Sequence, residues 1–183
     1  TADTSSIYTT DVSGTDDDAA GNTAYGYQAM DAITTGDNNT AIGTSALGAN
    51  TTADNNTAVG KQALFANTTG TQNVALGANT LDAHTTGSHN TTLGTDALTT
   101  LGSGSYNTAV GKGALANQSG ATHDNTAFGY NAGNDITTGT QSTLIGTLAG
   151  PSVTTGSQNT AVGYSALSSC ETGTYNVAVG RAA

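Results

Sequence analysis

Residues 56–64 read Asn-Thr-Ala-Val-Gly-Lys-Gln-Ala-Leu, and the first five of them form a motif that recurs along almost the whole chain. The motif Asn-Thr-Ala-aliphatic-Gly occurs ten times in 183 residues, beginning at Asn22, Asn39, Asn56, Asn73, Asn90, Asn107, Asn125, Ser142, Asn159 and Asn176. Successive motifs are 17 residues apart, except for one step of 18 between Asn107 and Asn125. A short fixed period over this length predicts one structural unit stacked on itself.

Each repeat is numbered here from its asparagine, as position 0. Position 4 is glycine in every repeat, and position 3 is always apolar: Tyr25, Ile42, Val59, Leu76, Leu93, Val110, Phe128, Ile145, Val162 and Val179. An apolar run between asparagine and glycine predicts a short strand at positions 1–3, and a second short strand is expected at positions 7–9. A helix is disfavoured, because a strict glycine weakens it and no apolar stripe recurs at a spacing of about 3.6 residues.

Two strands and two turns in 17 residues make one coil of an all-β, parallel β-solenoid or β-roll, in which equivalent residues stack every ~4.8 Å. We expect the position-3 side chains to form an apolar ladder inside the coil. The position-0 asparagines are expected to form a structural ladder, with amides bonded along the stack and to turn backbone. The extra residue of the 18-residue repeat is predicted to form a bulged outer turn between Gly120 and Asn125.

The chain divides into two parts. Residues 1–20 lack the motif and are predicted to be a polar, Asp-rich lead segment, whereas residues 21–183 form the array of ten coils, the last of them truncated. The N-terminal residues do not resemble a signal peptide. We therefore expect either export by another route or a processed or partial chain.

Composition excludes several partners. Only 9% of the residues are charged, against roughly 25% in ordinary globular domains, and the net charge is −10. The only cations are Lys61, Lys112 and Arg181. Because nucleic acids and anionic lipids require clustered cations, neither is an expected partner. No apolar stretch is long enough for membrane insertion.

The side chains capable of chemistry are few and separated. Asp16–Asp18 are oxygen ligands of the type that Ca²⁺ prefers, but a solvated acidic run is the favoured interpretation. His84, His89 and His123 are expected in surface loops, and Cys170, at position 11, is expected to be a small core residue. The sequence therefore predicts no catalytic residue, metal site or cofactor. A polysaccharide-cleaving enzyme is the weakest alternative, because the array repeats no pair of acids.

Tyrosine and threonine side chains provide two further candidate surfaces. Six tyrosines provide aromatic faces for carbohydrate, but they do not share one repeat position and are expected to be scattered: Tyr25, Tyr27, Tyr106, Tyr130, Tyr164 and Tyr175. Threonine recurs at position 1, as in solenoids that bind ice through threonine ladders. We expect these threonines on the same, inward strand face as position 3, which argues against ice binding.

The repeats resemble those of known fibre proteins. Residues 56–64, followed by Asn67-Thr68-Thr69-Gly70, are similar to repeats in phage and large-virus fibre proteins, including the chlorovirus glycoprotein repeat. Residues 74–77 and 177–180 resemble the Ser-Val-Ala-Ile-Gly units in the heads of trimeric autotransporter adhesins. The resemblance covers residues 21–183 and implies a homotrimer of parallel β-rolls around a threefold axis. Flat faces of alanine and glycine also suit close packing against identical neighbours.

These expectations lead to one functional hypothesis and one alternative. The chain is expected to be a structural and adhesive segment of an extracellular fibre, on a virion or a cell surface. Its expected partners are itself, as a homotrimer, and a surface glycan or protein receptor. The alternative is a monomeric ice-binding solenoid that uses its threonine ladders.

Overall fold

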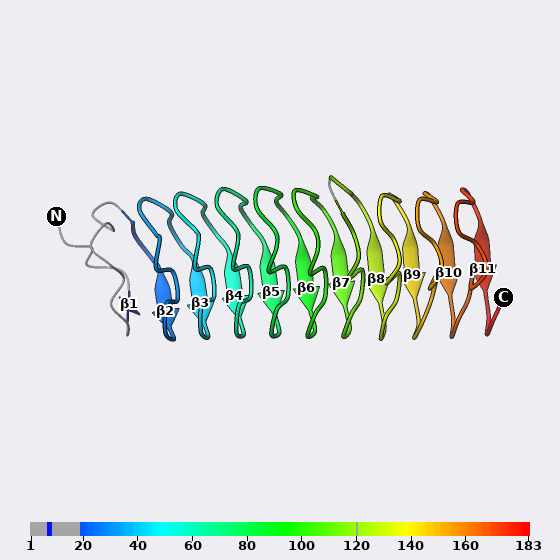
Figure 1. Ribbon diagram of the computed structural model, residues 1–183, viewed down its shortest axis with the longest axis horizontal. Helices are drawn as coiled ribbons and strands as arrows, with labels where there is room; N and C mark the ends of the chain where they lie inside the picture. The colour runs from blue at the N-terminus through cyan, green and yellow to red at the C-terminus, as the bar shows by residue number, and fades with distance from the viewer. Residues whose placement is uncertain (1–6, 9–18, 120) are drawn as a thin grey trace.

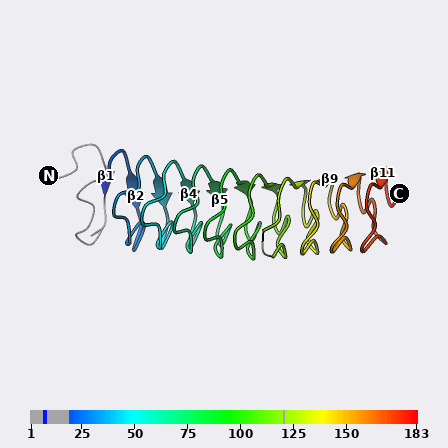
Figure 2. The same cartoon turned by 90° about the horizontal axis from the view of Figure 1, so that it is seen from above.

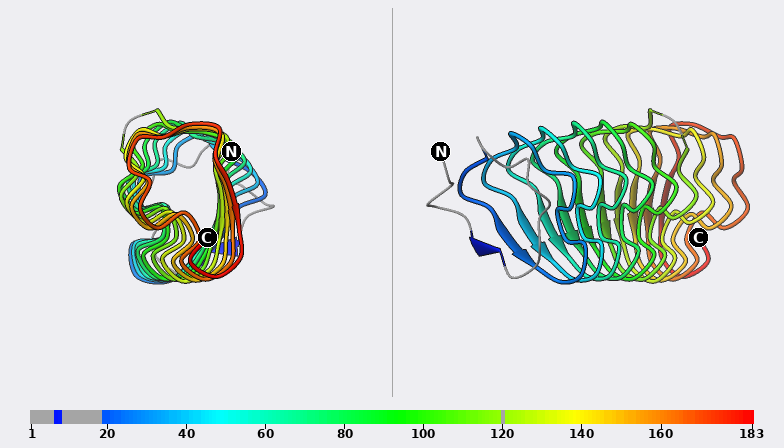
Figure 3. Two further views of the ribbon diagram at one scale, coloured as in Figure 1. Left: turned by 90° about the vertical axis from the view of Figure 1, so that its right-hand side faces the viewer. Right: turned by 60° about the vertical axis from the view of Figure 1, so that its left-hand side comes forward.

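The computed structural model describes residues 7–8, 19–119 and 121–183, and these residues form strands, turns and bends without a helix. Successive coils follow one another along a single axis, so that β1 and the C-terminus lie at opposite ends (Figures 1 and 2). Viewed along this axis, the coils superimpose as rings with one nearly straight wall, formed by the strands (Figure 3). The predicted all-β parallel solenoid is confirmed.

Eleven strands form one sheet in chain order, each parallel to the next. Their bounds are β1 (Ile7–Tyr8), β2 (Thr23–Tyr25), β3 (Thr40–Ile42), β4 (Thr57–Val59), β5 (Val74–Leu76), β6 (Thr91–Leu93), β7 (Thr108–Val110), β8 (Thr126–Phe128), β9 (Thr143–Ile145), β10 (Thr160–Val162) and β11 (Val177–Val179). Every strand from β2 onward occupies positions 1–3 of its repeat. In β3 and β4, for example, Ile42 is paired with Val59, so equivalent residues of adjacent coils lie side by side.

The sheet begins before the first repeat. Strand β1 pairs with β2 through Ile7 with Thr23 and Tyr8 with Ala24. The lead segment predicted for residues 1–20 therefore contributes a strand, which its sequence does not signal. The acidic run Asp16–Asp18, considered above for Ca²⁺, lies outside the described residues.

The strands face the opposite way from the prediction. The alanine at position 2 is buried, as shown by Ala41 and Ala58 at 0% exposure, whereas Ile42 on the same strand is 41% exposed. Successive side chains of a strand alternate between its two faces. Positions 0 and 2 therefore point inward, and positions 1 and 3 point outward. The predicted position-3 ladder exists, but the prediction that it lies inside the coil was wrong.

The narrow interior explains this orientation. The wall opposite the sheet contributes the large position-8 side chains, and these are fully buried: Met30, Leu47, Leu64, Leu81, Leu98 and Leu115. Methyl groups from position 2 are what remains to fill the space between the two walls. Because the buried asparagine at position 0 shares a face with position 2, it also sets which strand face is inside.

The second predicted strand, at positions 7–9, is absent. These residues form turns instead, in which positions 6 and 8 have positive φ, as at Ser45 (57°) and Leu47 (49°). The amide of Ala46 donates to the carbonyl of Gly43 at 3.2 Å, and the amide of Leu47 donates to Ala63 in the next coil at 3.0 Å. Positive φ is strained for such residues, and here the hydrogen bonds between coils hold the backbone in this conformation.

The position-4 glycine has a steric cause. Gly77 has φ of 138°, and a Cβ built on it would lie 2.6 Å from the carbonyl oxygen of Gly94 in the next coil. A side chain at this corner would therefore force adjacent coils apart. This close approach explains why the repeat keeps glycine here throughout.

The extra residue of the long repeat leaves the sheet register intact, since Thr108 of β7 still pairs with Thr126 of β8. The side-chain Nδ2 of Asn107 donates to the carbonyl of Thr122, which takes the place of the position-14 carbonyl used elsewhere. The extra residue is therefore accommodated between Gln118 and Thr122, slightly earlier than predicted. Gly120 itself lies outside the described residues.

Candidate functional site: ladders and outer faces

The asparagines at position 0 join neighbouring coils from within. The Nδ2 of Asn56 donates to the carbonyl of Gly70 at 2.8 Å, and its Oδ1 accepts from the amide of Asn73 at 2.9 Å. The same pattern recurs along the array, and the asparagines from Asn22 to Asn159 are at most 1% exposed. A buried amide with both ends bonded stabilises the stack, so these residues are structural, as the sequence predicts.

Ser142 shows which part of this arrangement is essential. Its Oγ accepts from the amide of Asn159 at 3.3 Å and its own amide donates to Asn125 at 2.9 Å. The chain of bonds from coil to coil is therefore continuous through the serine. The serine lacks only the side-chain N–H group that the asparagines donate to the carbonyl at position 14.

Two further ladders reinforce the coil surface, and sequence reasoning missed both. At position 12, the Thr34 hydroxyl donates to the carbonyl of Thr51 in the next coil at 2.9 Å. At position 15, side-chain oxygens accept from the amide of the preceding coil, as in Asp37 N–H to Asp54 Oδ1 at 2.8 Å. The available signal was that position 15 always carries a short side chain with an acceptor, or histidine.

The histidines do not converge. His84 is fully buried, so its assignment to a surface loop was wrong; it occupies position 11, where other coils place Ile33 or Leu101. Its Nε2 contacts the carbonyl of Gly87 at 2.8 Å, which makes Nε2 the protonated nitrogen. Burial lowers the pKa of His84 from its usual 6.5, and the carbonyls of Gly87 and Leu101 act against this.

The other two histidines lie elsewhere on the coils. His123 accepts a hydrogen bond from the Ser105 amide through Nδ1 at 3.0 Å, and exposed His89 stacks on Tyr106 with ring centroids 4.9 Å apart. Cys170 is half-buried at position 11, and its Sγ lies 3.5 Å from the Asn176 amide nitrogen. Within the described ranges, no three His, Cys, Asp or Glu side chains are grouped to hold a metal ion.

The position-11 column also holds polar groups that the fold leaves unpaired. Asn50 and Asn67, in adjacent coils, each donate to a turn carbonyl three residues on. Their Oδ1 atoms are buried without a partner. Unsatisfied buried acceptors destabilise a fold, so this column is less well paired than the position-0 ladder.

Two surface depressions of the described chain include one acid between them, Asp31, so neither has the pair of acids that a glycosidase needs. Burial raises the pKa of Asp82, with neighbouring Asp96 acting in the same direction. The Oδ1 of Asp96 accepts from the Asn79 amide at 3.1 Å. A shallow depression of about 260 Å³ lies elsewhere and includes Asp31 as its only acid.

The outer face of the sheet leaves several large apolar side chains of the described chain exposed. Position-3 side chains on it include Leu93 at 48%, Phe128 at 57% and Ile145 at 41% exposure. Position 1, mostly threonine, lies beside them and is half-buried to exposed. We call positions 1 and 3 of β2–β11 together the outer sheet face.

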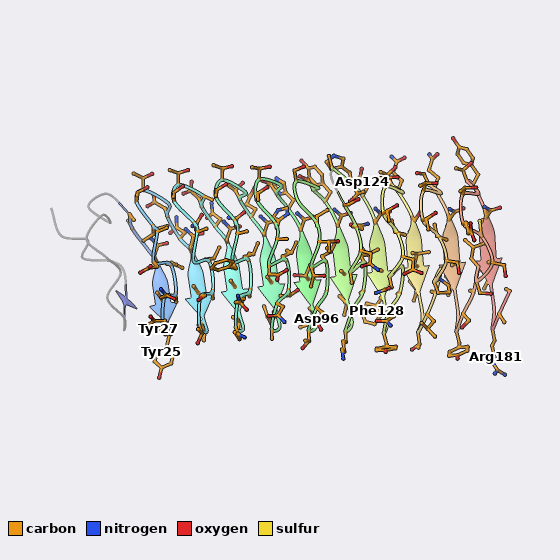
Figure 4. The ribbon with its side chains drawn as sticks, in the orientation of Figure 1. Tyr25, Tyr27, Asp96, Asp124, Phe128 and Arg181 are labelled. Atoms are coloured by element: carbon orange, nitrogen blue, oxygen red, sulfur yellow. The ribbon has the colours of Figure 1, made fainter. Side chains whose placement is uncertain are left out.

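The tyrosines occupy three repeat positions, all exposed. Tyr25 is at position 3, three others are at position 5, and Tyr106 and Tyr175 are at position 16. Figure 4 shows Tyr25 and Tyr27 along the same edge as Phe128 and Arg181. The sequence reading of scattered tyrosines therefore overlooked position 5, to which half of these six belong.

No protein-family model, curated protein or solved structure matches this chain. Among the described residues, none lies in a helix long and apolar enough to span a membrane.

Proposed function

We propose that the chain is a structural and adhesive segment of an extracellular fibre, on a virion or a cell surface, and that it assembles as a homotrimer around a threefold axis. The observation that carries this proposal is the outer sheet face. It carries an apolar or aromatic side chain, half-buried or exposed, at position 3 in every repeat, over strands that span roughly 45 Å at ~4.8 Å each. A row of partly exposed apolar side chains of this length favours an interaction site.

A second copy of the same chain matches this surface, because both copies have the same spacing between strands. Apolar side chains spaced by the strand repeat meet their best complement in another solenoid with the same repeat. Closed symmetric assemblies are the usual form of such self-contacts, and the resemblance of the repeats to fibre and adhesin repeats favours three copies. Packing the outer sheet faces together would remove the position-3 side chains from water.

The coil structure suits a mechanical role. Adjacent coils are joined by strand pairing, by the asparagine ladder and by side-chain bonds such as Thr34 to Thr51. A stack joined at several points around each coil resists bending. It can hold a recognition surface away from a particle, and a repetitive surface allows weak contacts to add by avidity.

Sedimentation of the recombinant chain tests the trimer. We expect the wild-type protein to sediment as a trimer, and the Leu93→Glu/Val110→Glu variant as a monomer with unchanged β-sheet circular dichroism, because both side chains point outward. Gln72→Glu, at exposed position 16, is the matched control and should remain trimeric. A wild-type chain that stays monomeric at high micromolar concentration would refute the assembly.

Ice binding is the second candidate, and the strand orientation supports it more than the sequence predicted. The position-1 threonines lie on the outer sheet face in register, as in the pairing of Thr40 with Thr57. Against it, the face is uneven, since large aromatic side chains are paired with smaller aliphatic ones, Phe128 with Val110 and Tyr25 with Ile42. Thermal hysteresis of a monomeric preparation decides: its absence at millimolar protein would eliminate this function.

A further inference from the structure

One row of exposed side chains holds every cation of this acidic chain. Position 5 follows the corner glycine and includes Lys61, Lys112 and Arg181, which are all the lysine and arginine residues present. All three are exposed. The net charge of the chain is −10. We call position 5 of the ten repeats the position-5 row. It carries three widely spaced positive charges, on a surface that is otherwise neutral or negative.

The same row holds three tyrosines. Tyr27, Tyr130 and Tyr164 are 70%, 51% and 50% exposed. The guanidinium carbon of Arg181 lies 5.7 Å from the centre of the Tyr164 ring. At this place a cation and an aromatic face of adjacent coils therefore contact each other along the axis, and both belong to one surface.

Position-3 aromatic residues, which belong to the outer sheet face, border this row at two places. Tyr25 precedes Tyr27 by two residues, and Phe128 precedes Tyr130 by two. Tyr25, Tyr27, Phe128 and Arg181 lie along one edge of the molecule (Figure 4). Asp96 is on the same edge, where its carboxylate accepts from the Asn79 amide.

We propose that the position-5 row binds an extended acidic polysaccharide of low charge density. This inference rests on the proposed adhesive function and names the class of molecule to which the fibre attaches. Tyrosine rings stack on the apolar faces of sugar rings, and lysine and arginine attract carboxylate or sulfate groups. A straight row along the solenoid axis suits a linear polymer.

The spacing of the cations selects a sparsely charged polymer. Lys61 and Lys112 are three coils apart, which is ~14 Å at the strand spacing. Single-stranded nucleic acid carries a charge on every nucleotide and needs a dense basic groove. The acidic remainder of this chain would repel such a polyanion, whereas a polysaccharide with an acid only every few sugars matches the row.

Affinity electrophoresis and calorimetry of the full chain test the proposal. The probes are gellan, with its carboxylates on every fourth sugar, its carboxyl-reduced form, hyaluronate, heparin and poly(dT). We expect binding to gellan, weaker binding to the reduced form, and none to poly(dT). Tyr130→Ser/Tyr164→Ser and Lys61→Gln/Lys112→Gln should each raise the Kd for gellan about tenfold, through loss of stacking and of charge contacts.

The matched control is Tyr106→Ser/Tyr175→Ser, which removes two equally exposed tyrosines at position 16 and should leave the Kd unchanged. Equal losses in all three variants, failure to bind gellan, or preference for heparin or poly(dT) over gellan would each overturn the proposal. Sedimentation of the same samples separates it from the assembly. If the chain is a trimer but binds no polysaccharide, only the proposed role of the position-5 row is refuted. If it is a monomer that binds polysaccharide, only the proposed trimer is refuted. If the position-5 variants dissociate the trimer, the row belongs to a subunit contact and not to a polysaccharide site.

Discussion

At the scale of single residues, a large side chain at one buried position fills the space left where a neighbouring buried side chain is missing. Gly133 and Gly150 replace the buried position-8 leucine in two successive coils. The side chain of Leu144, at position 2 between them, fills that space: a Cβ added to Gly133 would lie 2.7 Å from its Cδ1, and one added to Gly150 would lie 2.9 Å from its Cδ2. Leucine replaces the usual alanine because two neighbours lack their side chains.

Leu144→Ala is therefore expected to destabilise the protein, although alanine is the commonest residue at position 2. The variant leaves a cavity in the coil, and we expect the free energy of unfolding to fall by about 3 kcal/mol, measured by denaturant titration. Adding Gly133→Leu and Gly150→Leu to it should restore most of the loss, because both glycines have the positive φ (60° and 58°) that leucine adopts elsewhere at position 8. Full stability of the single variant would contradict the packing argument.

His84 makes stability depend on pH. Because its folded pKa is lowered, the unfolded chain binds the proton more readily. The stability contributed by the neutral imidazole is therefore present above the usual pKa of 6.5 and is lost as the pH falls toward the folded pKa. Melting temperatures between about pH 8 and pH 5 should decline less for His84→Leu, which copies Leu101 of the next coil. Parallel curves for the variant and the wild type would show that this histidine does not carry the dependence.

At the scale of elements, the period was readable from the sequence but the direction of the strand was not. The 17-residue spacing of asparagine and glycine predicts the register that aligns Ile42 with Val59. A strand of three residues with alanine at position 2 and valine at position 3 is apolar on both faces, so its pattern does not show which face is inside. The larger side chains at position 3 favoured burial of that face, but the buried asparagine at position 0 places the face with position 2 inside the coil.

The same limits apply to the candidate site. The position-0 ladder was predictable because asparagine recurs without a break except at Ser142. Turns at positions 7–9 were not, because leucine with φ near 50° is rare and only the bonds between coils, such as Leu47 to Ala63, maintain it. His84 was wrongly predicted to lie at the surface, because histidine is usually exposed in a loop. Its position 11, which holds Ile33 and Leu101 in other repeats, is the signal that indicates burial.

Removing one whole coil should leave the fold intact. Deletion of residues 56–72 joins Asn55 directly to Asn73, so the new junction has the same sequence pattern as the old one. We expect normal β-sheet circular dichroism and a lower melting temperature, since one interface between coils is lost. Deletion of residues 56–63 is the control and should prevent cooperative folding, because it breaks the register of the asparagine ladder.

At the scale of the whole molecule, stability is expected to vary along the axis. Each coil contacts only its neighbours, and strand β11 has one paired edge in the described chain, with Val177 and Val179 exposed by 75% and 68%. Hydrogen exchange should therefore show the greatest amide protection in the central strands β5–β8 and progressively less toward β11. Uniform protection along the array would mean that the coils unfold as a single cooperative unit.

The long repeat has a practical consequence. Between Gln118 and Thr122 the chain gains a residue while β7 and β8 stay in register. This bend therefore accommodates a change in length without altering the pairing of the strands on either side. A foreign peptide could be grafted into it and displayed at a set height along the rod. If the chain assembles as proposed, each rod would then carry three copies of that peptide at one level.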